Sequence, residues 1–305
     1  MANPNDNQLL AFNHQGLIPG PRETVEDFSK RADYCLELKD HLSAELKANL
    51  RADIDESPEV LDLLNNCLCS LYDVAPSWIP VFFSNYKLMP WHGGCAWIFQ
   101  ITEESPTAAI VQLRQAFRNS TKYLGIYDRE ELLSHELIHV GRMTFQEPKF
   151  EEIFTYQTSK SAFRRWLGPI IQSSIESVTF ILIIAMILVF DIFLITSNNP
   201  EAYRTALWLK LIPIGLIVFG LVRLAWKYRI YQKCLDNLEK CVGTAKNARA
   251  VAYRLTDDEI TAFSKMSTKE ISDYAAAHEQ KELRWRVIYL AYFEKKVEGR
   301  RQNAE

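Results

Sequence analysis

Apolar and polar positions alternate with different periods in successive parts of the chain. Residues 25–49 and 57–72 carry apolar side chains every three or four positions, which predicts two amphipathic helices. Short runs rich in branched and aromatic residues follow at 79–83, 96–102 and 108–113, separated by proline and glycine, and they predict strands. We therefore expect a small sheet among helices in the first half of the chain.

Two longer segments are apolar on every face. Residues 178–196 are 19 positions with one charge, and residues 206–226 are 21 positions with two. Each is long enough to cross the hydrocarbon core of a bilayer as a helix. The alternative is a pair of buried core helices, which rarely stay apolar all round for five turns. The pattern favours a transmembrane hairpin.

Charges at the ends of these segments predict their orientation. Basic residues precede the first segment and follow the second along the chain. The only charged residues in the loop between the two segments are Arg204 and Glu201. The basic residues are Lys160, Arg164, Arg165, Lys227, Arg229 and Lys233. The positive-inside rule then places both flanking regions, and hence both termini, in the cytoplasm. Asp191 and Lys210 should lie at similar depth, where they either neutralise each other or reach the headgroups separately.

The remainder of the chain is predicted to be all helical. A charged helix is expected at 227–253, two further helices start at Thr256 and Ser267 with capping-box patterns, and a last helix covers 281–298. We divide the chain into a domain at 1–165, a transmembrane hairpin at 166–228 and a helical cytoplasmic region at 229–305.

Composition narrows the functional classes. A net charge of −3 gives no basic excess of the kind that attracts nucleic acid, so nucleic-acid binding is not expected. The six cysteines form no CxxC pairs, and we expect mostly reduced, buried thiols. Residues 1–21 lack the apolar core of a secretory signal. These features indicate that the first domain stays on the cytoplasmic side.

Candidate chemistry lies in residues 131–145, ELLSHELIHVGRMTF. His135 and His139 are four residues apart and present both imidazoles on one helix face, a spacing that grips one zinc ion, with Glu136 beside them. Asp128 is the predicted N-cap of this helix. Two ligands are too few for a catalytic zinc, so another part of the chain must supply a third.

Residues 96–159 resemble the zincin metallopeptidases, and among them the gluzincins. In these enzymes the third ligand is a glutamate on the next helix, followed three positions later by a small residue. Glu152, with Thr155 after it, matches better than Glu151, which is followed by Phe154. Only 12 residues separate His139 from Glu152, and no aspartate follows to orient a histidine, so Tyr156 is a candidate for that role. The resemblance implies a compact α+β zincin-like domain.

The resemblance also implies a function, with Zn²⁺ as cofactor and Glu136 as the base in peptide-bond hydrolysis. Oxyanion or supporting roles are open to a group of nearby side chains, namely Tyr123, Tyr127, Tyr156, Arg142 and His92. Zincins bind substrate as an added strand, and the edge expected here is 93–100, beginning Gly93, Gly94, Cys95 and Ala96, or else 108–113. His92 could be a third histidine ligand, but a turn at the strand end is the preferred interpretation.

Two functions from different classes remain open. The first is a membrane-anchored zinc peptidase, and the second is a non-enzymatic membrane adaptor that retains the zincin fold. The short segment between 156 and the first span should hold the cleft near the bilayer, so the expected partners are lipid and a peptide or protein substrate at the membrane. The helical region is expected to form a wall or lid of the cleft. The pattern leaves substrate and oligomeric state open.

Overall fold

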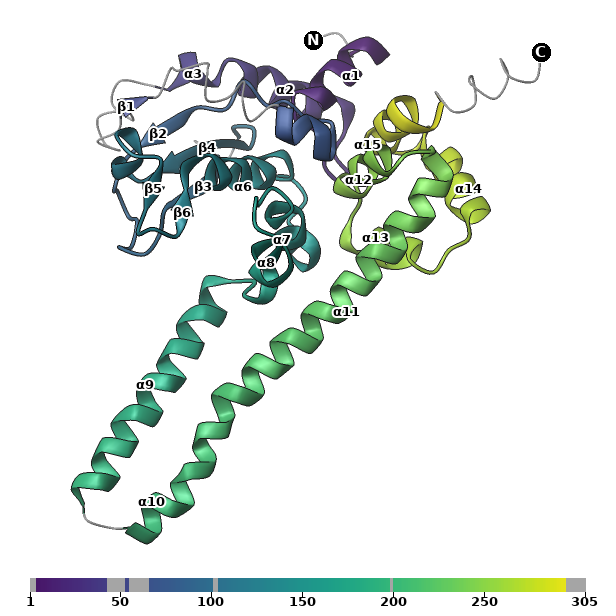
Figure 1. Cartoon of the computed structure of the whole chain (residues 1–305). Coiled ribbons are helices and arrows are strands. Elements are labelled where there is room, and N and C mark those ends of the chain that lie inside the picture. The colour runs from purple at the N-terminus through teal and green to yellow at the C-terminus, as the bar shows by residue number, and fades with distance from the viewer. Residues whose placement is uncertain (1–3, 43–52, 55–65, 101–103, 198–199, 295–305) are drawn as a thin grey trace.

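The protein consists of a globular part from which a long helical hairpin projects (Figure 1). The computed structural model describes residues 4–42, 53–54, 66–100, 104–197 and 200–294. Among these residues the chain is mostly helical with a small sheet. The coarse prediction of a small sheet among helices is therefore confirmed.

The elements of the globular part before the hairpin follow in chain order. They are α1 (Asp6–His14), α2 (Val25–Leu36), α3 (Leu38–His41), β1 (Asp53–Ile54), helical residues 66–72, β2 (Val81–Phe83), β3 (Gly94–Phe99), β4 (Ala108–Leu113), the 3₁₀ turn η1 (Gln115–Arg118), β5 (Lys122–Tyr123), β6 (Tyr127–Asp128), α6 (Arg129–Gly141), α7 (Pro148–Tyr156), α8 (Ala162–Leu167) and the 3₁₀ turn η2 (Gly168–Ile170). The expected helix at 25–49 is broken at Glu37, and its residues beyond 42 lie outside the described part. The first residues of the helix expected at 57–72 also lie outside the described part of the chain.

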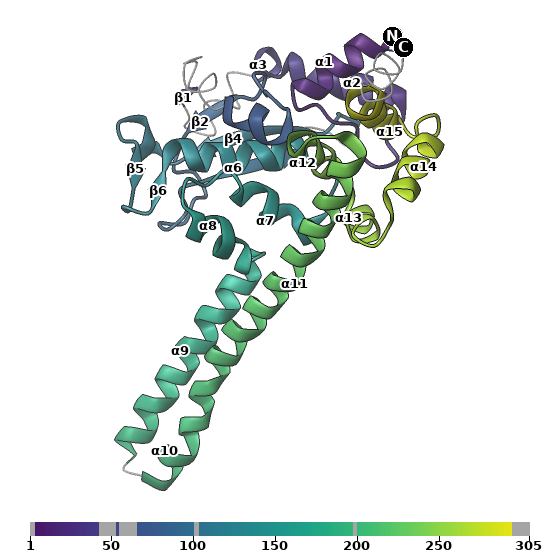
Figure 2. The ribbon, with the colours of Figure 1, turned by 45° about the vertical axis from the view of Figure 1, so that its right-hand side comes forward.

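The sheet has four strands in the order β1-β2-β4-β3. β2 and β4 are parallel, whereas β1 and β3 run antiparallel to their neighbours. β4 is interior and buried along its whole length, so β3 is an edge strand. α2 and α6 pack on opposite faces of the sheet (Figures 1 and 2). The edge of β3 therefore lies beside α6, the helix that carries the two histidines.

The hairpin is made by α9 (Ser174–Thr196), then α10 (Pro200–Ala206), the 3₁₀ turn η3 (Leu207–Lys210) and α11 (Leu211–Val242). Residues 175–196 and 200–242 are long and apolar enough to cross a membrane. Their apolar side chains are largely exposed, so the alternative of two buried core helices is wrong. Lys210 Nζ lies 2.9 Å from Asp191 Oδ2, so of the two alternatives left open for these residues the structure shows the pairing.

α11 crosses the predicted boundary at 228/229 without a break. It ends only at Gly243, whose φ of +89° suits a glycine C-cap. Its membrane-distal half buries Tyr231, Cys234 and Leu238 in the globular part. The helical state expected at 227–253 is confirmed except at the break around Gly243, but the separate start at 227 is wrong, because these residues continue the second span in α11 and then form α12.

Four short helices and a π turn follow α11. They are α12 (Ala245–Tyr253), α13 (Asp257–Phe263), α14 (Thr268–His278), α15 (Leu283–Ile288) and η4 (Tyr289–Phe293). Thr256 and Ser267 form the predicted capping boxes. These helices share one core with the first half of the chain: Tyr253 stacks on Tyr72, and Phe154 of α7 meets Tyr253 edge-on.

Candidate metal centre

Two helices and a short turn bring the candidate ligands together. α6 begins at the predicted cap, where Asp128 accepts a hydrogen bond from the backbone of Glu131. The chain then reverses over residues 142–147 and enters α7, with Pro148 in the first turn, where its missing N–H is no loss. α7 buries Phe150, and the neighbouring apolar side chains on that face, in the core. This burial turns its acidic positions toward α6.

His135, His139 and Glu152 converge to one point. The Nε2 atoms of the histidines are 3.3 Å apart, and each lies 3.8 Å from a carboxylate oxygen of Glu152. Ligands about 2.1 Å from a tetrahedral zinc stand roughly 3.4 Å from one another, which is close to this spacing. Two imidazoles and one carboxylate are also a catalytic zinc donor set. The residues present therefore fit the ion, with one side of the group left for water.

Glu151 holds a different position from its neighbour. One of its oxygens lies 3.1 Å from His139 Nδ1, and the other accepts from Arg142 Nε at 2.9 Å. It thus contacts the ring nitrogen that faces away from the group, where metal-binding histidines usually meet a carboxylate. Thr155 donates to Glu152 at 3.4 Å. The role of orienting a histidine was predicted for Tyr156, because no aspartate follows Glu152, but the carboxylate that contacts His139 Nδ1 is that of Glu151, just before Glu152.

Arg142 connects this arrangement to the C-terminal helices. It is 2% exposed, and its Nη1 atom donates to the backbone oxygens of Tyr253 and Leu255. The adjacent Gly141 leaves room for the hydroxyl of Tyr253, which donates to the backbone of Ile138 at 2.7 Å. Arg142 thus lies behind Glu151 and holds its carboxylate in position through the hydrogen bond from Nε. The C-terminal helices support α6 from behind, and the described lining of the two cavities at the site contains none of their residues, so the expected wall or lid is not found there.

Burial and neighbouring charges set the ionisation of the group. Burial, followed by the charges of His139 and Arg164, holds the pKa of His135 well below its usual value, which favours the neutral form that binds metal. Burial opposes protonation of His139 as well, but the hydrogen bond to Glu151 and the surrounding carboxylates outweigh it and raise its pKa to about 9. Burial also raises the pKa values of Glu136 and Glu152.

Glu136 points to the edge of β3. Its Oε2 accepts from the backbone N–H of Ala96 at 2.8 Å. Two cavities meet at its carboxyl group: one of about 170 Å³ beside His92, Gly93 and His135, and one of about 610 Å³ beside Cys95, Ala96 and His139. Of the two strands expected to offer an edge to substrate, β4 is interior, and β3 has a free edge among the residues that the structure describes. The cavities together run along it on both sides of Glu136.

Gly93 and Gly94 are required by close packing within the protein itself. A Cβ on Gly93 would stand 2.8 Å from Leu132 of α6, and one on Gly94 would stand 2.6 Å from the backbone oxygen of Gln112 in β4. The close backbone approach inferred from these glycines is therefore made by the protein's own α6 and β4. This packing draws the β3 edge against the helix that bears Glu136.

The remaining predicted residues divide by their position. Tyr127, Tyr156 and His92 line the smaller cavity, and Tyr156 meets the ring of His135 edge-on at 5.0 Å. Tyr123 instead donates its hydroxyl to the backbone of Pro90 at 2.6 Å. His92 belongs to a turn closed by its N–H on Met89, just before β3, as the preferred interpretation required. Its side chain is outside the metal-ligand group of the described residues.

Sequence reasoning missed one residue that lines the smaller cavity and one that packs behind it. Arg164 of α8 lines it and lies 3.2 Å from Glu131. Gly168 lets the chain pass Tyr156, since a Cβ there would stand 2.2 Å from the tyrosine ring. Arg164 had been noted only as a basic flank of the first span. Nothing in the spacing of Gly168 would have indicated its contact.

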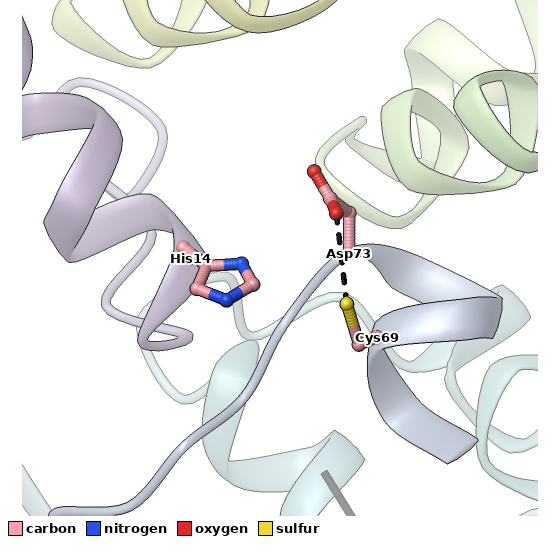
Figure 3. Close-up of side chains that lie close together, drawn as sticks. All are labelled: His14, Cys69 and Asp73. Carbon is pink, nitrogen blue, oxygen red and sulfur yellow. Dashed lines mark hydrogen bonds between the residues drawn. The ribbon is translucent and has the colours of Figure 1, made fainter. Parts of the chain in front are cut away.

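A second group of potential ligands, His14, Cys69 and Asp73, lies at the end of α1 (Figure 3). The carboxylate of Asp73 already contacts the thiol of Cys69 at 3.9 Å, Lys246 Nζ at 3.5 Å and the hydroxyl of Tyr292 at 3.3 Å. The ammonium group of Lys246 already pairs with the carboxylate that a cation would need as a ligand. This group is therefore a weaker metal site than the one between α6 and α7.

No family model, curated protein or solved structure matches the chain.

Proposed function

We propose that this protein is a membrane-anchored, zinc-dependent peptidase in which His135, His139 and Glu152 bind Zn²⁺ and Glu136 is the catalytic base. The observation that carries the proposal is the convergence of three ligand atoms from α6 and α7 within 4.8 Å. Glu136 lies beside that point and beside a free strand edge. A zinc peptidase that binds its substrate as an added strand uses all of these features, and they occur together here.

A zinc ion in this group would supply a Lewis acid that lowers the pKa of a water molecule to about 7. Glu136 is the carboxylate placed to take the proton of that water and return it to the leaving amine. Burial raises the pKa of Glu136, which suits a group that must both accept and release a proton near neutral pH. Glu151 and Arg142 hold His139 in place, and Tyr156, Tyr127 or His92 can donate to the oxyanion.

The substrate backbone is proposed to pair with the edge of β3. Strand addition uses main-chain hydrogen bonds for affinity and leaves alternate side chains to fill pockets. The cavities on the two sides of Glu136 are suited to side chains before and after the scissile bond. Ala96 N–H, which now donates to Glu136, would become available to substrate when the carboxylate turns toward the water.

The alternative is a non-enzymatic membrane adaptor that retains this fold. That function requires no convergence of ligands, and an orientation of Glu152 away from the histidines would have favoured it. The 3.8 Å separations of Glu152 from both rings support the peptidase instead.

The proposal is tested by metal analysis and cleavage of a peptide library by the purified full-length protein. Glu136→Gln should retain zinc and lose at least about 10²-fold in kcat, since it removes only general acid–base catalysis. Glu130→Gln on the same helix, whose side chain pairs with Lys160 at the surface, is the matched control and should cleave normally. Cleavage by Glu136→Gln at the wild-type rate, or absence of bound zinc, would reject the proposal.

We further propose that both flanking regions face the cytoplasm, on the basis of the charges around the spans. The test is labelling of single introduced cysteines in intact cells with a reagent that cannot cross the membrane. Glu201→Cys on α10 should react from outside and Lys281→Cys should not. The opposite pattern would reverse the orientation without affecting the proposed chemistry.

A further inference from the structure

Bulky apolar side chains lie at the tip of the β5–β6 hairpin, where turns usually carry polar residues. Leu124 is 57% exposed and Ile126 is 65% exposed. Leu124 has φ of +53° and Gly125 has φ of +68°. A leucine in the left-handed region is strained, and turn positions of this kind favour glycine, asparagine or aspartate. Neither the fold nor the metal group explains these two side chains.

A second set of exposed apolar side chains lies on α8 and beyond it. Phe163 is 71% exposed and Trp166 is 51% exposed, and Ile171 and Ile175 continue the series into α9. Arg164 joins the two sets, because its guanidinium donates to the backbone oxygen of Ile126 at 3.1 Å. We call Leu124, Ile126, Phe163, Trp166 and Ile171 the apolar rim. It is continuous with the helix that enters the bilayer.

The position of the rim agrees with this continuity. In both views the β5–β6 hairpin and α8 lie on the side of the globular part from which α9 and α11 descend (Figures 1 and 2). α14 lies on the far side. A bilayer that contains α9 would therefore lie next to α8 and the β5–β6 hairpin, the elements that carry most of the rim.

The polar residues beside the rim suit a headgroup layer. The Arg165 guanidinium donates to the backbone oxygens of Ser159 and Lys160, and in the described part of the chain no carboxylate neutralises it. Lys160 is 68% exposed at its side chain, although it also pairs with Glu130. Tryptophan next to free basic charge is typical of side chains at the membrane interface.

We propose that the apolar rim docks into the lipid bilayer and thereby presents the smaller cavity of the metal centre to membrane-embedded substrates. Arg164 and Tyr127 belong to the cavity lining and adjoin the rim, so the cavity opens next to the lipid surface. The substrate class is a membrane protein or anchored peptide whose extended segment leaves the bilayer beside the spans. The substrate part rests on the proposed peptidase function, whereas the docking part does not.

Docking is tested by depth measurement on the full-length protein in nanodiscs that contain anionic lipid. An environment-sensitive dye is attached to Ile126→Cys, and for comparison to Ser272→Cys on α14, after Cys67, Cys69 and Cys95 have been replaced by alanine. The dye at 126 should emit at shorter wavelength and be quenched by lipids that carry a nitroxide near the headgroup. The dye at 272 should report water. Equal, water-like signals at both positions would overturn docking.

The substrate part is tested with one peptide sequence, presented either free in solution or fused to a membrane anchor in the same nanodiscs. Leu124→Ser with Ile126→Ser should cleave the anchored peptide several-fold more slowly and the free peptide at the wild-type rate. Leu36→Ser removes a leucine that is 40% exposed at the end of α2, away from the apolar rim, and should change neither rate. Equal effects on both presentations would overturn the inference. A membrane-buried dye with no cleavage of either peptide would reject the peptidase and leave docking intact.

Discussion

At the residue scale, Glu151 and Glu152 are adjacent and yet face different atoms. Successive helical residues are turned by about 100°, so one carboxylate meets both Nε2 atoms while the other meets the back of His139. Glu152→Ala should abolish zinc binding, as measured by metal analysis after dialysis. Glu151→Gln should keep zinc but bind it about 10–100-fold more weakly, because it removes only the support of a ligand. Zinc retained in Glu152→Ala and lost in Glu151→Gln would exchange the two roles.

Protonation of His139 gives a second prediction. Its pKa of about 9 lies above the ordinary value, so below pH 9 the metal-free side chain holds a proton that zinc must displace. Zinc affinity should therefore rise with pH, by roughly tenfold per unit from this group, and level off near pH 9. Calorimetry at pH 7.5 in buffers of different ionisation enthalpy should give about one released proton.

Glu151→Gln is the control variant for the origin of the released proton. It removes the carboxylate responsible for much of the increase in the pKa of His139. Fewer protons should then be released at pH 7.5. An unchanged count in that variant would show that the proton comes from elsewhere.

The sequence predicts the candidate metal ligands more readily than the side chains that hold those ligands in position. His135, Glu136 and His139 follow from spacing along one helix, and Glu152 follows from a family pattern. The contact of Glu151 with Arg142 depends on the angle at which α7 crosses α6, which no local pattern encodes. For the same reason Tyr123 looked equivalent to Tyr156, although its hydroxyl is bound to Pro90.

At the scale of elements, the contact between α6 and α12 is sensitive to one methyl group. A Cβ on Gly141 would stand 2.1 Å from the hydroxyl of Tyr253, which is buried and cannot move freely. Gly141→Ala should destabilise the protein by about 1–3 kcal/mol, as overpacking does, and lower its melting temperature. Gly215→Ala is the control, because nothing lies within 4 Å of that position.

A second variant separates overpacking from other effects of Gly141→Ala. Adding Tyr253→Phe removes the clashing oxygen and leaves the nearest ring carbon at 3.2 Å. The double variant should therefore be more stable than Gly141→Ala alone, by thermal unfolding. An additive loss would show that the clash is not the cause.

Helix starts were predicted more accurately than strand order. Caps at Asp128, Thr256 and Ser267 depend on residues three positions apart, so the local sequence suffices. Which strand is the free edge depends on β2 pairing with the far side of β4, a contact between distant segments. Apolar content alone left 93–100 and 108–113 equally suited to the edge.

At the scale of the whole molecule, the hairpin leaves and re-enters one folded unit at adjacent points. Arg223 Nη2 donates to Ile170 at 3.0 Å, and Lys227 Nζ donates to Gln172 at 2.6 Å. Replacing residues 174–220 by about six Gly/Ser residues, which span roughly 14 Å, should give a soluble, folded protein that binds zinc. Size-exclusion chromatography and metal analysis check this. Aggregation of that protein would mean that the globular part needs the membrane to fold.

The matched comparison is a longer deletion that continues to residue 242. It removes Tyr231, Cys234 and Leu238 from the core, so it should fail to fold. Charge and hydropathy predicted the two spans but not this sharing of α11, because they do not reveal which helix face meets a distant core.

Because α11 is one unbroken helix, it connects the transmembrane hairpin directly to the elements around the candidate metal centre. Its 32 residues form a rod of about 48 Å, and its upper half contacts α7 through Tyr231 on Phe154 and Lys227 on the backbone of Lys149. Membrane helices answer a change in hydrocarbon thickness by tilting. A tilt of α11 would displace α7, the helix that carries Glu151 and Glu152. Turnover of one soluble peptide should therefore differ between nanodiscs of short-chain and long-chain lipids. The form that lacks residues 174–220 is the control, and its turnover should be the same with both lipids. Equal rates in both lipids would mean that α11 does not transmit a change in membrane thickness to α7, whereas a difference would mean that membrane thickness regulates the proposed peptidase.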